Sequence, residues 1–335
     1  MAKKDNNLAA AKPAVQPIAQ PAPPKVSVII PIYGRLGDVP RLVEKLNQQT
    51  VKPREIILVD SSPSELKDVP PGVIYLKNTV DLALSGDYNH GARHATGDLL
   101  LLMQQDCAPG SDSDLEENLR LLTPDRVAVS SSVTLPRENW QSYNFWGQAL
   151  MARWVGTVQQ GISGKFDLIR ADVFRKIGGY DTDTFGFAGE DMDLWLRLSR
   201  EGAVFVAPTR VIHLHNQSGK TTCADLFKKH YQLAESFGAL VRRWGLRLRE
   251  VPYASHVAHH LAKYLYLVIP FCLIFPRQLI PFLLVAANFT NLDVWRISSP
   301  KKFAFLILNP ALFLVGAAGT LKGFVTGKQR YSVNK

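Results

Sequence analysis

The chain has 335 residues, of which 46% are hydrophobic and 20% are charged, and its formal net charge at pH 7 is +10. This length is sufficient for one large domain, or for a domain with an appendage. The three cysteines form no CxxC pair and are too scattered for a disulfide framework, so a reducing compartment is expected. The positive charge suits a membrane surface or a phosphate-bearing ligand. No compact basic stripe carries interleaved aromatic residues, so we expect no nucleic-acid partner.

Residues 1–24 are rich in Ala, Pro, Gln and Lys and show no apolar periodicity. Such a segment cannot bury a core, and it is expected to form a disordered tail. Its lysines precede no apolar stretch of the kind that a secretory signal contains, so we expect no signal peptide there.

Residues 25–220 alternate between short apolar runs and segments with apolar side chains at helical spacing. The pattern predicts strands over 26–30, 55–59, 72–76, 99–103, 127–133, 166–169, 203–207 and 211–214, and helices over 39–49, 86–95, 171–176 and 190–198. Strands that alternate with helices predict an α/β fold, a Rossmann-like and mostly parallel sheet flanked by helices. Ligands in such sheets bind outside the carboxyl ends of the strands. Asp60 and the turn of residues 104–106 fall at such ends, which is the first functional clue.

Two acids at strand ends each allow two interpretations. Asp106 follows an apolar strand, where its carboxylate is free to bind a cation, but it can equally be a turn former before Pro109 and Gly110. Asp60 can accept hydrogen bonds from a ligand or merely cap the next element.

Three acids, Glu190, Asp191 and Asp193, crowd the first turn of the helix predicted over 190–198. The helix dipole stabilises each by about 0.3–1 kcal/mol, which is the structural explanation. Three acids in four residues also repel one another, and a Gly- and Phe-containing loop over 183–189 precedes them as a possible lid. A functional role is therefore favoured.

His213 and His215 alternate along a predicted strand and must point to opposite faces. At most one of them can face a given site, and a lone strand histidine is more often a core group. His256, His259 and His260 resemble an amphipathic face, and we assign them no metal.

Together these segments resemble glycosyltransferase family 2, the inverting enzymes with the GT-A fold. The resemblance covers about residues 25–218 and depends on the order and spacing of short motifs. These motifs are VSVIIPIYGR at 26–35, EIILVD at 55–60, Asn89-x-Gly91, ATGD at 95–98, LIR at 168–170, GGYD at 178–181 and GEDMDL at 189–194.

The resemblance implies roles for individual residues. Asp191 is the implied catalytic base, with Glu190 beside it. The implied donor-binding residues are Pro31, Tyr33, Arg35, Asp60, Asn89, Gln104, Gln105 and Asp106, and the implied acceptor-side residues are Gly189, Asp193 and Trp195.

The resemblance also implies a metal site. Asp106 would hold the metal, with His213 as an additional ligand. Oxygen ligands suit Mg²⁺ or Mn²⁺, and an imidazole favours Mn²⁺. Gln104 stands where the family has the first Asp of its Asp-x-Asp motif, so it brings no charge and lowers the expected metal affinity. Rhamnosyltransferase-like members of the family share such an amide.

The implied activity is transfer of a sugar from a nucleotide-sugar donor to a hydroxyl of a glycan or lipid-linked acceptor, as in cell-surface polysaccharide synthesis. Asp191 would deprotonate the acceptor, and the anomeric centre would invert. A nucleotidyltransferase is one alternative, although residues 33–37 are too sparse in Gly and basic residues for its phosphate loop. A non-catalytic membrane scaffold with a degenerate sugar-nucleotide fold is the other, supported only by Gln104.

The C-terminal third changes in character. Residues 221–260 predict a basic amphipathic helical region that either lies at a membrane interface or packs on the preceding domain. Residues 261–335 contain apolar segments at 261–275, 279–290 and 303–325 and end in a basic tail. Only the last segment approaches the ~20 residues of a spanning helix, and lysines on both sides of it give no topology. We expect a membrane-associated or integral protein at the cytoplasmic face of the inner membrane, because nucleotide sugars are cytosolic.

Overall fold

The computed structural model describes residues 24–80, 83–186, 188–213, 220–252, 264–268 and 274–329. Several expectations fall outside these ranges: almost all of the N-terminal tail, most of the apolar segment at 261–275, the basic tail from residue 330, and His215, His256, His259 and His260.

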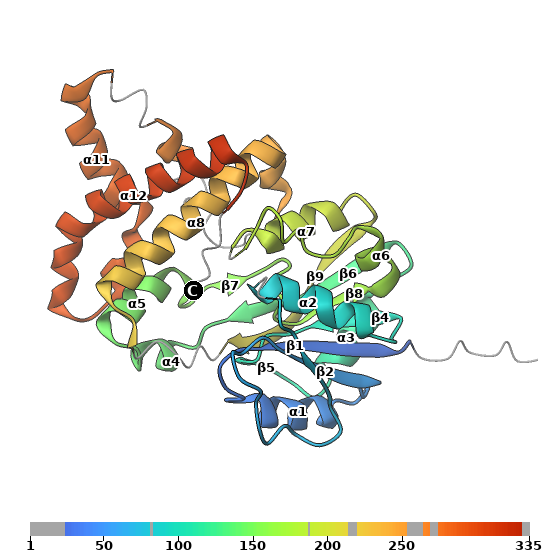
Figure 1. The fold of residues 1–335 in the computed structure, drawn as a ribbon. Helices are drawn as coiled ribbons and strands as arrows, with labels where there is room; N and C mark the ends of the chain where they lie inside the picture. The colour runs from blue at the N-terminus through green and yellow to red at the C-terminus, as the bar shows by residue number, and fades with distance from the viewer. Residues whose placement is uncertain are drawn as a thin grey trace, which may run out of the picture.

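A nine-stranded sheet forms the centre of the described chain, in the order β3-β2-β1-β4-β8-β6-β9-β5, with β7 paired to β6 (Figure 1). Its strands are β1 (Val26–Ile32), β2 (Glu55–Asp60), β3 (Ile74–Lys77), β4 (Leu99–Leu102), β5 (Cys107–Pro109), β6 (Arg126–Thr134), β7 (Val158–Gln159), β8 (Asp167–Arg170) and β9 (Ala203–His213). The two strands expected at 203–207 and 211–214 are one continuous strand, β9, because its pairing with β6 continues across a register shift.

The sheet contains both parallel and antiparallel pairs, and its longest ladders, β1 with β2 and β6 with β9, are parallel, in agreement with the expected mostly parallel sheet. Strands β1 to β4 pair in parallel, but β8 runs antiparallel to both β4 and β6, and β5 runs antiparallel to β9. Strand β8 runs antiparallel because residues 135–166 lead the chain away from β6 and back to the sheet at the carboxyl end of β4, where Asp167 pairs with Leu102.

Two layers of helices cover the faces of the sheet. Helices α1 (Val39–Gln48) and α3 (Asp114–Leu121) pack on one face, and α2 (Ala83–His94), α6 (Ala171–Lys176) and α7 (Glu190–Leu198) on the other. Successive side chains of β1 point to opposite faces of the sheet, so Ile30 packs with α1 on one face and Ile29 packs with α2 on the other. Gly91 allows the close approach of α2, because a Cβ there would lie 2.5 Å from Ile29 Cγ2.

The C-terminal region is helical and packs on the sheet-bearing part through α8 (Cys223–Trp244) (Figure 1). Its other long helices are α11 (Pro276–Thr290) and α12 (Phe305–Thr326), and α8 continues into a short 3-10 helix, η3 (Gly245–Glu250). Phe237, Leu240 and Trp244 of α8 belong to the same buried cluster as α7. The basic amphipathic helix was expected either to lie at a membrane interface or to pack on the preceding domain, and in the structure α8 packs on that domain.

Glycines bring α12 into backbone contact with α8. A Cβ at Gly323 would lie 1.8 Å from the carbonyl oxygen of Glu235, and one at Gly319 would lie 2.7 Å from that of Tyr231. Lys322 pairs with the buried Glu235 at 2.7 Å. Among the described residues, Pro300–Thr326 is the one helical stretch long and apolar enough to cross a membrane, and 44% of its most apolar window is buried.

Candidate active site

The loops that follow β1, β2 and β4 meet at one edge of the sheet, because these parallel strands end side by side. The Tyr33 N–H donates to Oε1 of Gln105 at 3.2 Å, and the Gly34 N–H donates to Oγ of Ser62 at 2.7 Å. The Tyr33 side chain is 62% exposed. Arg35 is also exposed. At this edge, therefore, the Tyr33 ring and the Arg35 guanidinium are exposed to solvent, and the loops beneath them are hydrogen-bonded to one another.

Asp60 lies at the same edge but presents no open carboxylate. Its side chain is fully buried and accepts hydrogen bonds from the Ser62 N–H at 2.8 Å, from Lys77 Nζ at 2.9 Å and from the Tyr75 hydroxyl. Burial opposes ionisation, but these hydrogen bonds outweigh it and lower the pKa of Asp60. This carboxylate therefore supports the loops at this edge, and its predicted contact with a ligand stays a prediction.

Two other predicted donor-binding residues also have defined places within the fold. Pro31 is buried within β1. Asn89 on α2 donates from Nδ2 to the carbonyl oxygen of Tyr180 and accepts the Tyr180 N–H at Oδ1, both at 2.8 Å. Gly179 makes room for this pairing, since a Cβ there would lie 2.3 Å from Oδ1 of Asn89. Asn89 thus joins α2 to the turn that leads toward α7, and its predicted contact with a donor stays a prediction.

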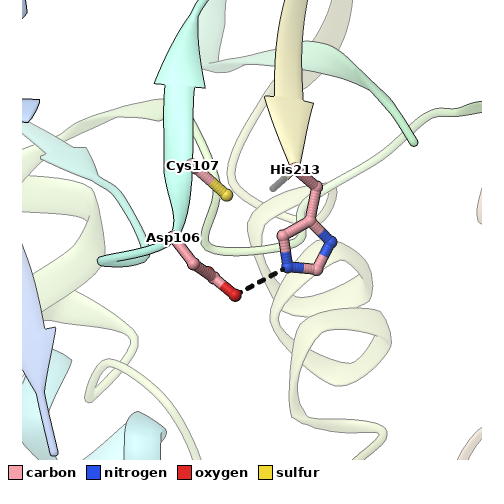
Figure 2. Close-up of side chains that lie close together, drawn as sticks. All are labelled: Asp106, Cys107 and His213. Atoms are coloured by element: carbon pink, nitrogen blue, oxygen red, sulfur yellow. Dashed lines mark hydrogen bonds and ion pairs between the residues drawn. The ribbon is translucent and has the colours of Figure 1, made fainter. Parts of the chain in front are cut away.

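The predicted metal ligands Asp106 and His213 do come together (Figure 2). Oδ2 of Asp106 lies 3.2 Å from Nε2 of His213, and the register of β5 with β9 pairs Cys107 directly with His213. The candidate ligand atoms of all three residues lie within 4.8 Å of one another. A turn after β4 and the end of a strand more than a hundred residues later therefore form one cluster.

The donor set of this cluster fits a hard divalent cation. Burial lowers the pKa of His213, against the opposing effect of its hydrogen bond with Asp106, so the imidazole is neutral and can coordinate. Burial raises the pKa of the Cys107 thiol, which keeps it protonated and a poor ligand. One carboxylate and one imidazole remain, a set that suits Mn²⁺ or Mg²⁺ completed by ligand or water oxygens.

Gln104, beside this cluster, turns toward the loop before β8. Its Nε2 donates to the carbonyl oxygen of Ser163 at 3.4 Å. Asp167 shapes that loop by accepting the N–H groups of Ser163 at 2.8 Å and Gly164 at 2.5 Å. Complete burial raises the pKa of Asp167 to about 6, although these hydrogen bonds and one from Ser130 oppose the rise. The amide at position 104 therefore helps to hold a loop that places Lys165 at the site.

Helix α7 begins with the predicted acidic pair. Gly189 precedes it with φ +87°, and a Cβ at that position would press on Leu240 and Ser236 of α8. The Glu190 carboxyl group is buried, and its Oε2 has no hydrogen-bond partner among the described residues. Burial, followed by the charge of Asp191, raises the pKa of Glu190 to about 8, so this group is protonated at neutral pH. Asp191 is partly exposed, and its Oδ1 accepts the Met192 N–H at 2.8 Å.

The predicted acceptor-side residues Asp193 and Trp195 face inward instead. Asp193 is fully buried, pairs with Arg197 at 2.7 Å and with Arg243 at 3.3 Å, and accepts Nε1–H of Trp244 at 2.9 Å. Trp195 is buried in the same core cluster. Residues 192–196 of α7 are all buried, so both side chains lie against the rest of the fold although they are two positions apart on the helix, and their acceptor-side role stays a prediction.

A stacked pair of tyrosines links the two groups of acids. The rings of Tyr88 and Tyr180 lie 5.5 Å apart between centroids. Beyond the effect of burial, the charge of Asp106 contributes to the raised pKa of Tyr88, while Glu190 and Asp191 contribute to that of Tyr180. Adjacent rings thus lie within electrostatic reach of the strand-end acid and of the helix-start acids.

Lys165 connects the same two groups and was not found by sequence reasoning. After burial and the effect of Asp106, its charge adds to the lowering of the His213 pKa and opposes the rise of the Cys107 pKa, and it also opposes the rise of the Glu190 pKa. Lys229 of α8 was also missed. Burial lowers its pKa to about 8, and Glu190 opposes this shift. The turn Ser163-Gly164-Lys165 before a predicted strand could have indicated the first lysine, but nothing in the local sequence distinguishes the second.

Comparison with known proteins agrees with this architecture. Residues 27–178 match the model of the family described as glycosyl transferase family 2. The O-antigen biosynthesis protein RfbC of Myxococcus xanthus is 27% identical over 58% of this chain and 18% of its own length. The O-antigen chain rhamnosyltransferase RfbN of Salmonella typhimurium is 26% identical over 57% of this chain and 67% of its own length. The chain thus matches less than a fifth of the first relative and about two thirds of the second.

A solved structure shows the same fold. The mannosyltransferase PcManGT from Pyrobaculum calidifontis, in complex with GDP-Man and Mn²⁺, superposes with a TM-score of 0.56 over 90% of this chain and 88% of that one, at 18% identity. The family motifs predicted from the sequence, the family match and this likeness agree. Residues 27–178 are therefore similar to glycosyltransferase family 2, and the chain has a GT-A-like fold.

Proposed function

We propose that this chain is an inverting glycosyltransferase that moves a sugar from a nucleotide-sugar donor to a hydroxyl of a glycan or lipid-linked acceptor in cell-surface polysaccharide synthesis. Residues 25–220 are its proposed catalytic domain. The observation that carries the proposal is that the charge of Lys165 affects the pKa of both His213, which contacts Asp106, and Glu190, which precedes Asp191. The stacked rings of Tyr88 and Tyr180 lie between the same two groups of acids. The RfbN relative, an O-antigen chain rhamnosyltransferase, supports the acceptor class.

On the donor side, the exposed Tyr33 and Arg35 would contact the nucleotide, and Asp106 and His213 would hold a divalent cation. That cation, when bound, supplies positive charge to the leaving diphosphate. Lys165 adds a fixed positive charge beside the same group. The Mn²⁺ bound by the mannosyltransferase with the same fold supports a divalent cation here, either Mn²⁺ or Mg²⁺.

On the acceptor side, the Asp191 carboxylate removes the proton of the acceptor hydroxyl. The hydroxyl oxygen forms a bond to the anomeric carbon of the donor sugar as the bond from that carbon to the diphosphate oxygen breaks. The nucleoside diphosphate leaves with the bonding electrons, and attack from the opposite face inverts the configuration. Glu190, protonated at neutral pH, can donate a hydrogen bond from its buried carboxyl group.

The same proposal includes a membrane surface as partner. Apolar side chains are exposed along α11 and α12, among them Ile280, Leu284, Val285, Phe289, Leu306, Ile307, Leu314, Phe324 and Val325. Residues 264–329 also contain Arg277, Arg296, Lys301, Lys302, Lys322 and Lys328, against Asp293 as their acid. Apolar area flanked by basic groups suits an anionic membrane. Because α12 is fastened along α8, we propose that this face lies in the plane of the inner membrane, on the cytoplasmic side.

The catalytic proposal is tested by nucleotide release. Purified full-length protein is incubated with a panel of UDP-, GDP- and dTDP-sugars and Mn²⁺, and the released nucleoside diphosphate is measured with and without a chelator. We expect release from at least one donor, lost on chelation and in Asp106→Asn. Binding of no donor, measured by calorimetry across the panel, would leave the non-catalytic scaffold as the better account.

The membrane proposal is tested by flotation. We expect the protein to float with vesicles that contain anionic phosphatidylglycerol and less with neutral phosphatidylcholine vesicles. Val285→Asp combined with Ile307→Asp should abolish flotation, while Val80→Asp, at an exposed apolar position outside both helices, should not. Equal flotation of all variants would contradict the assignment of this face.

A further inference from the structure

The loop that leads into the acidic helix start is held by a residue from the far end of the chain. The Gln329 N–H donates to the carbonyl oxygen of Thr184 at 2.9 Å. Its side chain continues the contact, since Oε1 accepts the Ala188 N–H at 3.1 Å. Gln329 is itself buried. Residues 184 and 188 are therefore bound to one glutamine, and residue 188 stands two positions before Glu190.

The same glutamine is also bound to α8. Its Nε2 donates to the carbonyl oxygen of Gln232 at 3.0 Å. One side chain thus joins the loop to a helix. Its amide oxygen, Oε1, accepts a hydrogen bond from the loop, and its amide nitrogen, Nε2, donates one to α8. Only an amide of this length satisfies both partners, because a carboxylate lacks the donor and a shorter side chain cannot span the gap.

The end of α12 determines where Gln329 lies. The helix stops at Gly327, which has φ +68° and donates its N–H to the carbonyl oxygen of Gly323 at 2.8 Å. Nη1 of Arg242 on α8 donates to the carbonyl oxygen of Phe324 at 3.2 Å. Because Gly323 packs against the α8 backbone, residue 329 has a defined position relative to both helices.

A second attachment secures the first turn of α7. Arg243 pairs with Asp181, at the start of the loop, and with the buried Asp193 at 3.3 Å. Trp244 donates to Asp193 at 2.9 Å. The loop and the helix start are therefore held at both ends by α8 and by the segment after α12, and the acids at 190 and 191 lie between these attachments.

We propose that Gln329 is a positioning residue for Glu190 and Asp191, through which the C-terminal helices set the geometry of the active-site loop as well as contacting a membrane. This inference rests on the proposed function only for its catalytic consequence. Removing the side-chain amide frees the Ala188 N–H and lets the loop move relative to α7. A small displacement of the base from the acceptor hydroxyl lowers the rate of the chemical step more than it lowers donor binding.

The test uses the full-length protein with three substitutions. Gln329→Ala removes both side-chain contacts, Gln329→Glu keeps the acceptor for Ala188 but not the donor to Gln232, and Gln278→Ala changes an exposed glutamine on α11 as the matched control. We expect kcat of Gln329→Ala to fall roughly 10- to 100-fold with the donor KM within about twofold of wild type. Gln329→Glu should retain part of the rate, and Gln278→Ala should match wild type.

Hydrogen exchange of the amides of residues 184–191, measured without substrate, provides a readout that does not depend on activity. We expect Gln329→Ala to exchange faster at Ala188 while the amides of β1 stay protected. If the wild-type protein transferred no sugar, the proposed function would fail, yet the exchange data would still decide whether Gln329 holds the loop. Unchanged exchange, faster exchange with unchanged kcat, or an equal loss of kcat and donor affinity would each overturn the inference.

Discussion

Oδ2 of Asp106 and Nε2 of His213 lie 3.2 Å apart, although 107 positions separate the two residues in the sequence. The contact follows from the antiparallel pairing of β5 with β9, which brings the turn after β4 to the end of β9. A buried neutral imidazole beside a partly exposed carboxylate is the arrangement that a divalent cation needs from its protein ligands.

The first prediction concerns this pair. Asp106→Asn removes the anionic ligand, so the divalent cation should bind more weakly and sugar transfer at limiting Mn²⁺ should fall about 100-fold or more. His213→Ala should have a smaller effect that excess Mn²⁺ partly reverses, because it removes a neutral ligand. The measurement is transfer rate against Mn²⁺ concentration. Asp112→Asn, at an exposed position nearby, is the control and should not change the curve.

The second prediction concerns the proposed base. Asp191→Asn should lower kcat by about 10²- to 10⁴-fold while the donor still binds, since the amide cannot accept the proton of the acceptor hydroxyl. Donor affinity is measured by calorimetry and transfer by release of nucleoside diphosphate. Asp172→Asn, an exposed acid in the first turn of α6, controls for loss of a helix-dipole contact. Turnover near that of wild type in Asp191→Asn would assign the base elsewhere.

The third prediction concerns the pH dependence of stability. Burial raises the pKa of Glu190 from 4.5 to about 8, so the folded protein binds this proton more tightly than the unfolded chain does. The free energy of unfolding contributed by Glu190 is therefore largest at low pH and declines as the pH rises from about 4.5 to about 8. Glu190→Gln should reduce the decline across this window, measured by urea unfolding at several pH values.

Glu138→Gln is the matched control for that experiment, because Glu138 is an exposed acid in the first turn of α4 (Arg137–Gln141). Its curve should parallel that of wild type. A Glu190→Gln curve that also parallels wild type would show that the Glu190 carboxyl group titrates in the folded protein as it does in the unfolded chain.

The fourth prediction separates structure from substrate contact at Asp193. Asp193→Asn leaves Arg197 without its buried carboxylate and weakens the hold of Arg243, so the free energy of unfolding should fall by about 3 kcal/mol. The acceptor KM of the folded protein should not change. Urea unfolding and initial rates measure the two quantities, and Asp183→Asn, an exposed acid in the preceding loop, serves as control. A raised acceptor KM without loss of stability would restore the acceptor-side interpretation.

Much of the local structure could be predicted because its determinants are local. The apolar run at 26–30 forms the buried strand β1, and the spacing of Leu42, Val43 and Leu46 forms the buried face of α1. The acids at 190 and 191 do open a helix. The direction of β8 could not be predicted, because it depends on where an excursion of some thirty residues returns to the sheet.

The sequence by itself determined the resemblance to a family, the alternation of strands and helices, and the residue types available for chemistry, since each of these depends on short stretches of neighbouring residues. Only the tertiary structure decided which polar groups remain open to a ligand. Asp60 bonds with Lys77 on the next strand, and Asn89 and Asp193 bond with partners far away in the chain, whereas Lys165, Lys229 and Gln329 are brought to the site from positions that no motif marks. The physical reason is that burial and pairing depend on contacts between distant segments, such as residues 188 and 329, and such contacts leave no periodic trace in the sequence.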